Sequence, residues 1–110
     1  MVFQLSNNDT FVQKSMLRQL TNLIEAMNGV RIEVVTHSHG IDLLLKDCPF
    51  RKQIEKLERN GVEFLICENT IRAEKLDLSE LSRTAKPIPA GVAHIVRRQS
   101  EGWSYIKAGY

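Results

Sequence analysis

One cysteine, Cys67, is the strongest candidate for chemistry in this sequence. It ends the apolar run 62–67 and is followed by polar residues. A cysteine reacts as its thiolate, and a helix N-terminus lowers a thiol pKa through unpaired N–H groups and the helix dipole. The adjacent Glu68 opposes the thiolate, whereas Arg72 would favour it by folding back over the turn. We therefore predict a nucleophilic thiol at Cys67, with a small buried core residue as the alternative.

Polar side chains follow three predicted strands and are candidates to support the thiol or line a ligand pocket. The supporting candidates are Asn7, His37, His39, Asn69 and Thr70. Carboxyl ends of parallel strands share one edge of a sheet, so we expect these groups near Cys67. Because an imidazole titrates near neutral pH, His37 and His39 could transfer protons or bind an anion; solvated loop histidines are the alternative.

Other kinds of site lack their sequence patterns. The histidines and cysteines match no zinc-ligand spacing, and the glycines form no phosphate-binding loop, so we predict neither a metal nor a cofactor. Ser38 lacks the flanking glycines of a nucleophile elbow. Cys48 follows a leucine-rich run and is expected to pack in the core. In a reducing compartment both cysteines are expected to be free thiols.

Composition limits the class of protein. The chain has 110 residues, 43% hydrophobic and 25% charged, which suits one globular domain over residues 1–110. The net charge of +2 comes from 15 basic and 13 acidic residues without a basic stripe, so direct nucleic-acid binding is not expected. No apolar stretch is long enough to span a bilayer, which predicts a cytoplasmic protein without a membrane partner.

Alternating helices and strands must position these groups. Strands are predicted over residues 2–6, 30–36, 62–67, 86–89 and 103–107. Helical segments are predicted over residues 11–27, 41–45, 49–60, 71–75, 77–81 and 90–101. Such alternation favours a mostly parallel five-stranded sheet with helices on both faces. Trp103 and Tyr105 in the last strand are expected either on a sheet edge or in an oligomer contact.

Three segments resemble the DsrE/DsrF-like family, in particular its small stand-alone members. They are residues 35–44, after the second strand, residues 61–70, around Cys67, and residues 89–102, the closing helix. The resemblance implies a three-layer α/β/α fold of the Rossmann-like or flavodoxin-like kind. It also implies assembly into homotrimers or homohexamers.

The resemblance further implies a role for the thiol. In better-known relatives, a cysteine matched by Cys67 carries sulfur as a persulfide, in sulfur oxidation or in the relay that supplies tRNA thiolation. Thr70 stands where some relatives have a second cysteine, so the sulfur would pass to another protein. The expected function is a sulfur carrier of sulfurtransferase type with a donor or acceptor protein as partner. The alternative is a non-catalytic homo-oligomer that binds or senses a small ligand.

Overall fold

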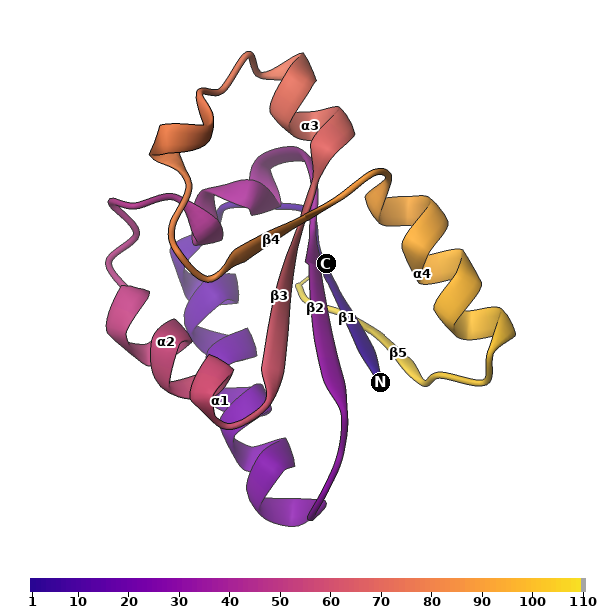
Figure 1. Cartoon of the computed structure of the whole chain (residues 1–110). Helices are drawn as coiled ribbons and strands as arrows, with labels where there is room; N and C mark the ends of the chain where they lie inside the picture. The colour runs from indigo at the N-terminus through magenta and orange to yellow at the C-terminus, as the bar shows by residue number, and fades with distance from the viewer. Residues whose placement is uncertain (110) are drawn as a thin grey trace.

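Five parallel strands form one sheet, in the order β4-β3-β2-β1-β5 (Figure 1). The computed structural model describes residues 1–109. The strands are β1 (Val2–Leu5), β2 (Ile32–Thr36), β3 (Val62–Cys67), β4 (Ala85–Ile88) and β5 (Tyr105–Lys107). The predicted five-stranded α/β fold is confirmed, and the sheet is fully rather than mostly parallel.

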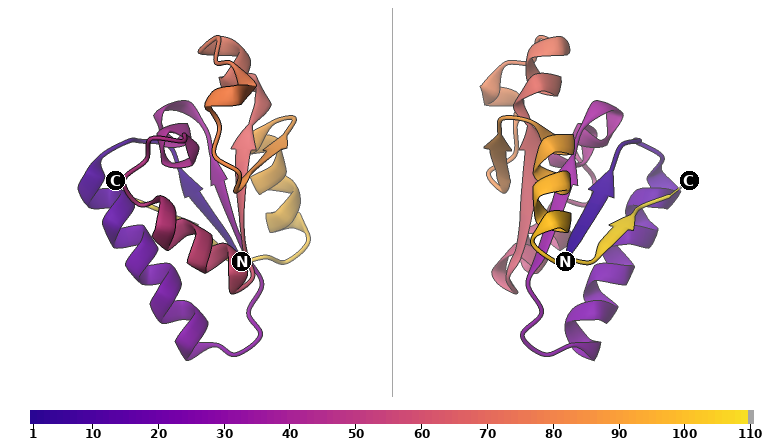
Figure 2. Two further views of the ribbon diagram at one scale, coloured as in Figure 1. Left: turned by 60° about the vertical axis from the view of Figure 1, so that its left-hand side comes forward. Right: turned by 90° about the vertical axis from the view of Figure 1, so that its right-hand side faces the viewer.

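Helices cover both faces of the sheet (Figure 2). The α-helices are α1 (Thr10–Ala26), α2 (Arg51–Arg59), α3 (Glu68–Ala73) and α4 (Gly91–Ser100), and the 3-10 helices are η1 (Ser38–Leu44) and η2 (Leu78–Glu80). Helices α1 and α2 lie on one face and α4 on the other, which confirms the three layers. Within residues 1–109, no helix is long and apolar enough to cross a membrane.

The alternation of side chains along each strand divides the core into two unequal parts. Phe3 and Leu5 of β1 face α1 and α2, where most of the buried hydrophobic side chains gather. Val2, which precedes Phe3 on β1, faces α4. Beneath α4 lies a smaller group, the α4-side cluster, made of Val2, Val35, Leu65 and Ile95. Helix α4 is therefore held to the sheet by few apolar contacts.

The order of the strands sends the chains that leave β3 and β4 to opposite faces of the sheet. From β1 to β4, each new strand is added on the same side of the previous one. The segments that connect these strands pack on the face of the sheet covered by α1 and α2. After β3, for example, Ile71 and Leu76 join the core on that face. The return to β5 uses α4 on the opposite face. Crossover connections between parallel strands are right-handed, so a connection that runs in the opposite direction along the sheet must pack on the opposite face. Chains leaving β3 and β4 thus diverge, and such a divergence is where open α/β sheets bind ligands.

Two helices begin three residues earlier than the sequence predicted. Helix α3 begins at Glu68 rather than at residue 71, because Cys67 has extended backbone angles and acts as its N-cap. An acid in the first turn also suits the positive end of a helix. The 3-10 helix η1 begins at Ser38 rather than at residue 41, since the Gly40 N–H already bonds to the His37 carbonyl at 2.9 Å.

Candidate functional site

Cys67 lies at the carboxyl end of β3, where the chains that leave β3 and β4 diverge. It is the last residue of β3 and pairs in register with Ile88, the last residue of β4. Its side chain is on the α4 side of the sheet, two positions beyond Leu65 of the α4-side cluster. Only 5% of the residue is exposed, so the thiol is largely shielded from solvent.

Two helix N-termini converge on the thiol. Cys67 is the N-cap of α3, and the first residue of α4, Gly91, donates its N–H to Sγ at 3.3 Å. A glycine permits this approach, since a Cβ at residue 91 would lie 3.2 Å from Val35 Cγ1 and 3.3 Å from Cys67 Cβ. The positive ends of both helix dipoles therefore face the sulfur.

These donors favour the thiolate. Burial by itself would raise the pKa of Cys67, but the N–H groups of Gly91, Thr70 and Asn69 and the Thr70 hydroxyl hold it below its ordinary value. Thr70 Oγ1 also accepts the Ser38 N–H at 3.1 Å, which ties the start of α3 to the loop after β2. Backbone donors thus make Cys67 a better nucleophile at neutral pH.

Arg72 does not support the thiol in the way the sequence suggested. Its guanidinium donates to Asn69 Oδ1, one turn back on α3. Asn69 therefore contributes to the site through its backbone N–H, while its side chain pairs with Arg72. Backbone N–H groups, rather than the Arg72 guanidinium, therefore stabilise the thiolate of Cys67.

His37 lies beside the site and bonds away from the thiol. Its Nε2 lies 2.7 Å from Gln4 Nε2, and its Nδ1 lies 3.0 Å from Ser38 Oγ. Gln4 accepts the Tyr105 hydroxyl through Oε1, so its amide N–H donates to the imidazole. Burial, followed by the charge of Lys107, lowers the pKa of His37. A neutral imidazole at this position shapes the wall next to Gly91 and makes no hydrogen bond to the sulfur.

The other two supporting candidates have different partners. His39 is exposed and lines a cleft of about 100 Å³ beside η1. Asn7 accepts the Asp9 N–H at 3.1 Å through Oδ1 and so helps to begin α1. Neither contact involves Cys67. The structure thus brings Asn69, Thr70 and His37 to the thiol but gives His39 and Asn7 local roles.

A buried ion-pair network beneath α4 was not predicted. Glu33 of β2 is only 2% exposed. Its carboxylate accepts hydrogen bonds from Arg98 Nε at 3.0 Å and from Arg98 Nη2 at 2.8 Å. His94 Nε2 lies 2.7 Å from Glu33 Oε1. Burial would raise the pKa of Glu33, but hydrogen bonds from Arg98 and His94 lower it. An acidic residue inside a buried strand was the only sequence signal for this network.

Trp103 extends this network. Its ring lies under the Arg98 guanidinium at 4.4 Å and the Arg31 guanidinium at 5.1 Å, measured to the ring centroid. The indole packs against the α4-side cluster. Each cation gains from the ring face, and Arg98 loses freedom to leave Glu33. The network therefore also anchors the segment that follows α4.

The second cysteine is separated from the first by the sheet. Cys48 belongs to the core under α1 and α2, and burial raises its pKa. Both cysteines are free thiols. Among residues 1–109, no three His, Cys, Asp or Glu side chains are grouped closely enough to hold a metal ion. Chemistry at this site therefore depends on Cys67 without a neighbouring thiol.

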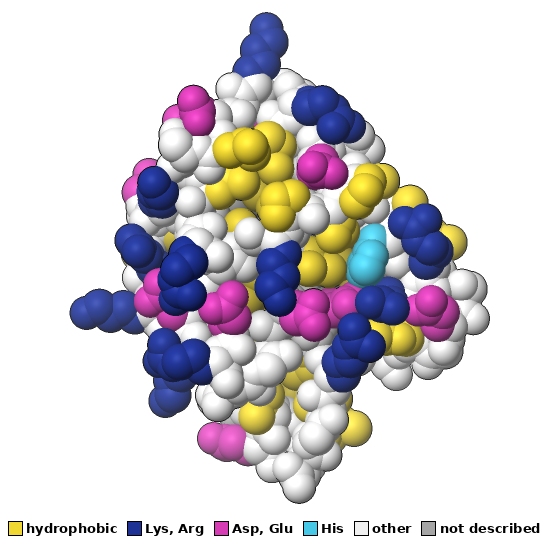
Figure 3. All heavy atoms as spheres, in the orientation of Figure 1, with side chains coloured by type: hydrophobic (Ala, Val, Ile, Leu, Met, Phe, Trp, Pro, Cys, Tyr) yellow, Lys and Arg dark blue, Asp and Glu magenta, His cyan; other side chains and the backbone are white. Residues whose placement is uncertain are grey.

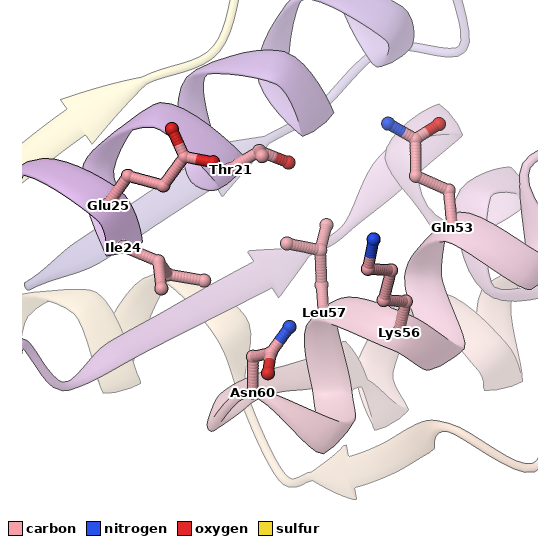
Figure 4. A pocket seen from close by; sticks show the side chains of 7 residues that line it. All are labelled: Thr21, Ile24, Glu25, Gln53, Lys56, Leu57 and Asn60. Atoms are coloured by element: carbon pink, nitrogen blue, oxygen red, sulfur yellow. The ribbon is translucent and has the colours of Figure 1, made fainter.

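A cleft also lies away from the thiol, on the other face of the sheet. It has a volume of about 350 Å³ and lies between α1 and α2. Figure 4 shows the side chains around it: Thr21, Ile24, Glu25, Gln53, Lys56, Leu57 and Asn60. Ile24 and Leu57 make part of its wall apolar. This cleft is a separate feature, and it contributes no residue to the Cys67 site.

The fold and the strand-end thiol define a small all-parallel α/β protein with a cysteine site. The chain belongs to the DsrE/DsrF-like family, whose profile matches residues 2–108. Its structure is similar to that of a protein of unknown function from Methanobacterium thermoautotrophicum, with a TM-score of 0.92, 37% identity and 96% of each chain covered.

A more distant structure shares the fold. It is a conserved protein of unknown function from Bacteroides thetaiotaomicron, with a TM-score of 0.70, 12% identity, and 96% of this chain and 92% of the other covered. No curated protein matches the sequence. The family assignment therefore rests on the profile and on the first of these two structures.

Proposed function

We propose that the protein carries sulfane sulfur on Cys67 as a persulfide. The observation that carries this proposal is the hydrogen bond from the Gly91 N–H to Sγ at 3.3 Å. Together with the amides at the start of α3, it favours an anionic sulfur at the end of β3. A persulfide is also anionic when it loses its proton, so the same donors would stabilise the loaded form.

The transfer follows thiol exchange chemistry. The Cys67 thiolate attacks the outer sulfur of a donor persulfide R–S–SH. A new S–S bond forms, the donor leaves as R–S⁻, and the proton stays on the outer sulfur of Cys67–S–SH. An acceptor thiolate R′–S⁻ then attacks that outer sulfur, giving R′–S–SH and restoring the Cys67 thiolate. No net oxidation or reduction takes place.

The acceptor in this proposal belongs to another molecule. Cys48 lies in the core on the other face of the sheet, and Thr70 contributes a hydroxyl rather than a thiol. The protein would therefore be a sulfur carrier between a donor and an acceptor protein rather than an enzyme with its own turnover. Free thiols suit a reducing compartment, so we place this activity in the cytoplasm.

Sulfur loading is expected to require Cys67 alone. The reduced protein is incubated with a small sulfane-sulfur donor and its intact mass is measured. Wild type and Cys48→Ala should each gain the mass of one sulfur atom, whereas Cys67→Ser should gain none. Cys48→Ala is the matched control because it removes the thiol that lacks the helix N-termini. Equal sulfur addition to Cys67→Ser would exclude the proposal.

The low exposure of Cys67 favours one second candidate, a non-catalytic binding module. In that function the thiol would only line or seal the ligand site, since 5% exposure is typical of a packed cysteine. Cys67→Ser would then preserve any stabilisation by a bound ligand. A native thiol that resists even small alkylating reagents would support this candidate over the sulfur carrier.

We also propose that copies of the chain associate through α4 and β5. Val92 and Val96 of α4 are 57% and 59% exposed, and Ile95 between them faces the sheet. The edge strand β5 adds the exposed Tyr105 and Ile106. On the face in Figure 3, acidic and basic side chains form a band across the molecule, and apolar patches lie beside this band. Exposed apolar side chains beside a sheet edge support association, and the family resemblance implies that the assembly is a homotrimer or homohexamer.

A charge in this surface is expected to break the assembly. Val96→Glu should shift the wild-type oligomer to a monomer in light scattering, because association would bury the new carboxylate. Gln53→Glu adds the same charge on α2 and should leave the oligomer intact. A Val96→Glu protein with the wild-type oligomer mass would show that α4 is not the contact.

A further inference from the structure

Helix α4 has two contacts of different kinds with the sheet. Its first residue, Gly91, places its N–H on Cys67 Sγ. Farther along, His94 and Arg98 bind the buried carboxylate of Glu33. Besides Gly91, Ile95 is the only residue of α4 classed as buried. With so little apolar packing, the polar contacts have a large share in fixing where α4 lies.

The pairing with Glu33 constrains orientation as well as distance. The Arg98 guanidinium uses two donors on the two carboxylate oxygens, at 3.0 Å to Oε1 and 2.8 Å to Oε2. A planar fork of this kind sets an angle that a single ammonium cannot set. His94 adds a third contact to Oε1 from one turn earlier on the helix. Rotation or sliding of α4 would break several of these bonds together.

We propose that Glu33, His94 and Arg98 are positioning residues for Cys67. They fix α4 on β2 and thereby hold the Gly91 N–H at the sulfur. The inference deepens the proposed function, since it names the residues that keep the thiol ready to accept sulfur. None of the three touches the reacting atoms.

The helix can transmit this constraint because it is short and regular. Arg98 lies seven residues after Gly91 on α4, a span of roughly 10 Å at 1.5 Å per residue. A small tilt at the Glu33 end therefore moves the Gly91 N–H by a comparable amount. The room there is limited, since a Cβ on residue 91 would already crowd Val35 and Cys67.

The test is a titration of the Cys67 thiol in a Cys48→Ala background, followed by thiolate absorbance, and it needs no sulfur donor. Glu33→Gln and Arg98→Met remove charges of opposite sign. If Glu33 and Arg98 acted on the thiol only as distant charges, these two substitutions would move the thiol pKa in opposite directions. Loss of positioning should instead raise the thiol pKa in both variants. The thiolate fraction at pH 7 should fall by several-fold, up to about tenfold for one lost hydrogen bond.

Two further variants calibrate the result. Gly91→Ala disturbs the same N–H directly and should raise the thiol pKa in the same way. Arg83→Met breaks surface ion pairs with Glu55 and Glu58 and should leave the titration unchanged. If Arg98→Met fails to fold, Arg98→Lys replaces it, since it retains the charge but loses the fork. The expected direction is the same.

The outcomes separate this inference from the proposed function. Opposite shifts in Glu33→Gln and Arg98→Met, or an unchanged thiol pKa in Arg98→Lys, would reduce the network to a distant charge effect and overturn the inference. A wild-type titration in folded Glu33→Gln would also overturn it. Should wild type fail to load sulfur while both variants raise the thiol pKa, the proposed function is lost and the positioning role stands.

Discussion

Replacement of Glu33 by alanine is expected to lower the free energy of unfolding by about 3 kcal/mol, because breaking a buried ion pair leaves its partners unpaired. Arg98 and His94 both depend on this carboxylate, which is 2% exposed. Urea denaturation measures the loss directly.

Glu63→Ala is the matched control for this prediction. Glu63 pairs with Glu33 in register on the neighbouring strand, but its ion pair with Lys86 is long, at 3.9 Å, and partly exposed. Surface pairs of this kind contribute at most about 1 kcal/mol. Equal losses in Glu33→Ala and Glu63→Ala would show that the buried network adds little to stability.

The same carboxylate should make stability depend on acid. Glu33 has a lowered pKa in the folded protein, because Arg98 and His94 stabilise its charged form. The contribution of Glu33 to stability is therefore complete above its pKa in the unfolded chain, about 4.3. This contribution is lost as the pH falls through the lower pKa of the folded protein. Between pH 6 and pH 3, wild type should lose more stability than Glu33→Gln. Parallel curves for the two proteins would contradict this assignment.

Gly40→Ala is expected to cost about 3 kcal/mol or to prevent folding, as severe overpacking does. A Cβ at this position would lie 2.0 Å from the carbonyl oxygen of Leu5 and 2.6 Å from its carbonyl carbon. The clash is with backbone, so η1 must move away from β1. That movement would also pull Ser38 from its bond to Thr70 beside the thiol.

Gly29→Ala provides the comparison for Gly40→Ala. Residue 29 has open space around it and a φ of +79°, so alanine there meets only backbone strain. That strain costs about 1 kcal/mol. Thermal unfolding should rank wild type first, then Gly29→Ala, then Gly40→Ala. A Gly40→Ala protein as stable as Gly29→Ala would mean that η1 is more adaptable than its contacts indicate.

Local signals were sufficient to predict most of the fold. Strand β3 has the bounds that its apolar run predicted, and α1 begins one residue earlier than its amphipathic pattern indicated. Asp9 caps α1 with its carboxylate, as a polar residue before such a pattern should. These features depend on neighbours in the chain, which a sequence shows directly.

The parts of the site that were missed depend on distant partners. Cys67 could be singled out because it ends a strand, but its donor Gly91 lies 24 residues later and reaches it only because β3 and β4 pair in register. Glu33 meets His94 and Arg98 across 61 and 65 residues. Those pairings follow from the return of α4 over the opposite face, which no local pattern specifies.

The most direct test of the sulfur carrier is a two-stage mass measurement on one wild-type sample. Reduced protein is first treated with a sulfane-sulfur donor, freed of it, and then given a thiol acceptor. We expect one added sulfur on the peptide that contains Cys67, followed by its loss and the appearance of persulfide on the acceptor. A protein that never gains the sulfur, or gains it elsewhere, would contradict the account.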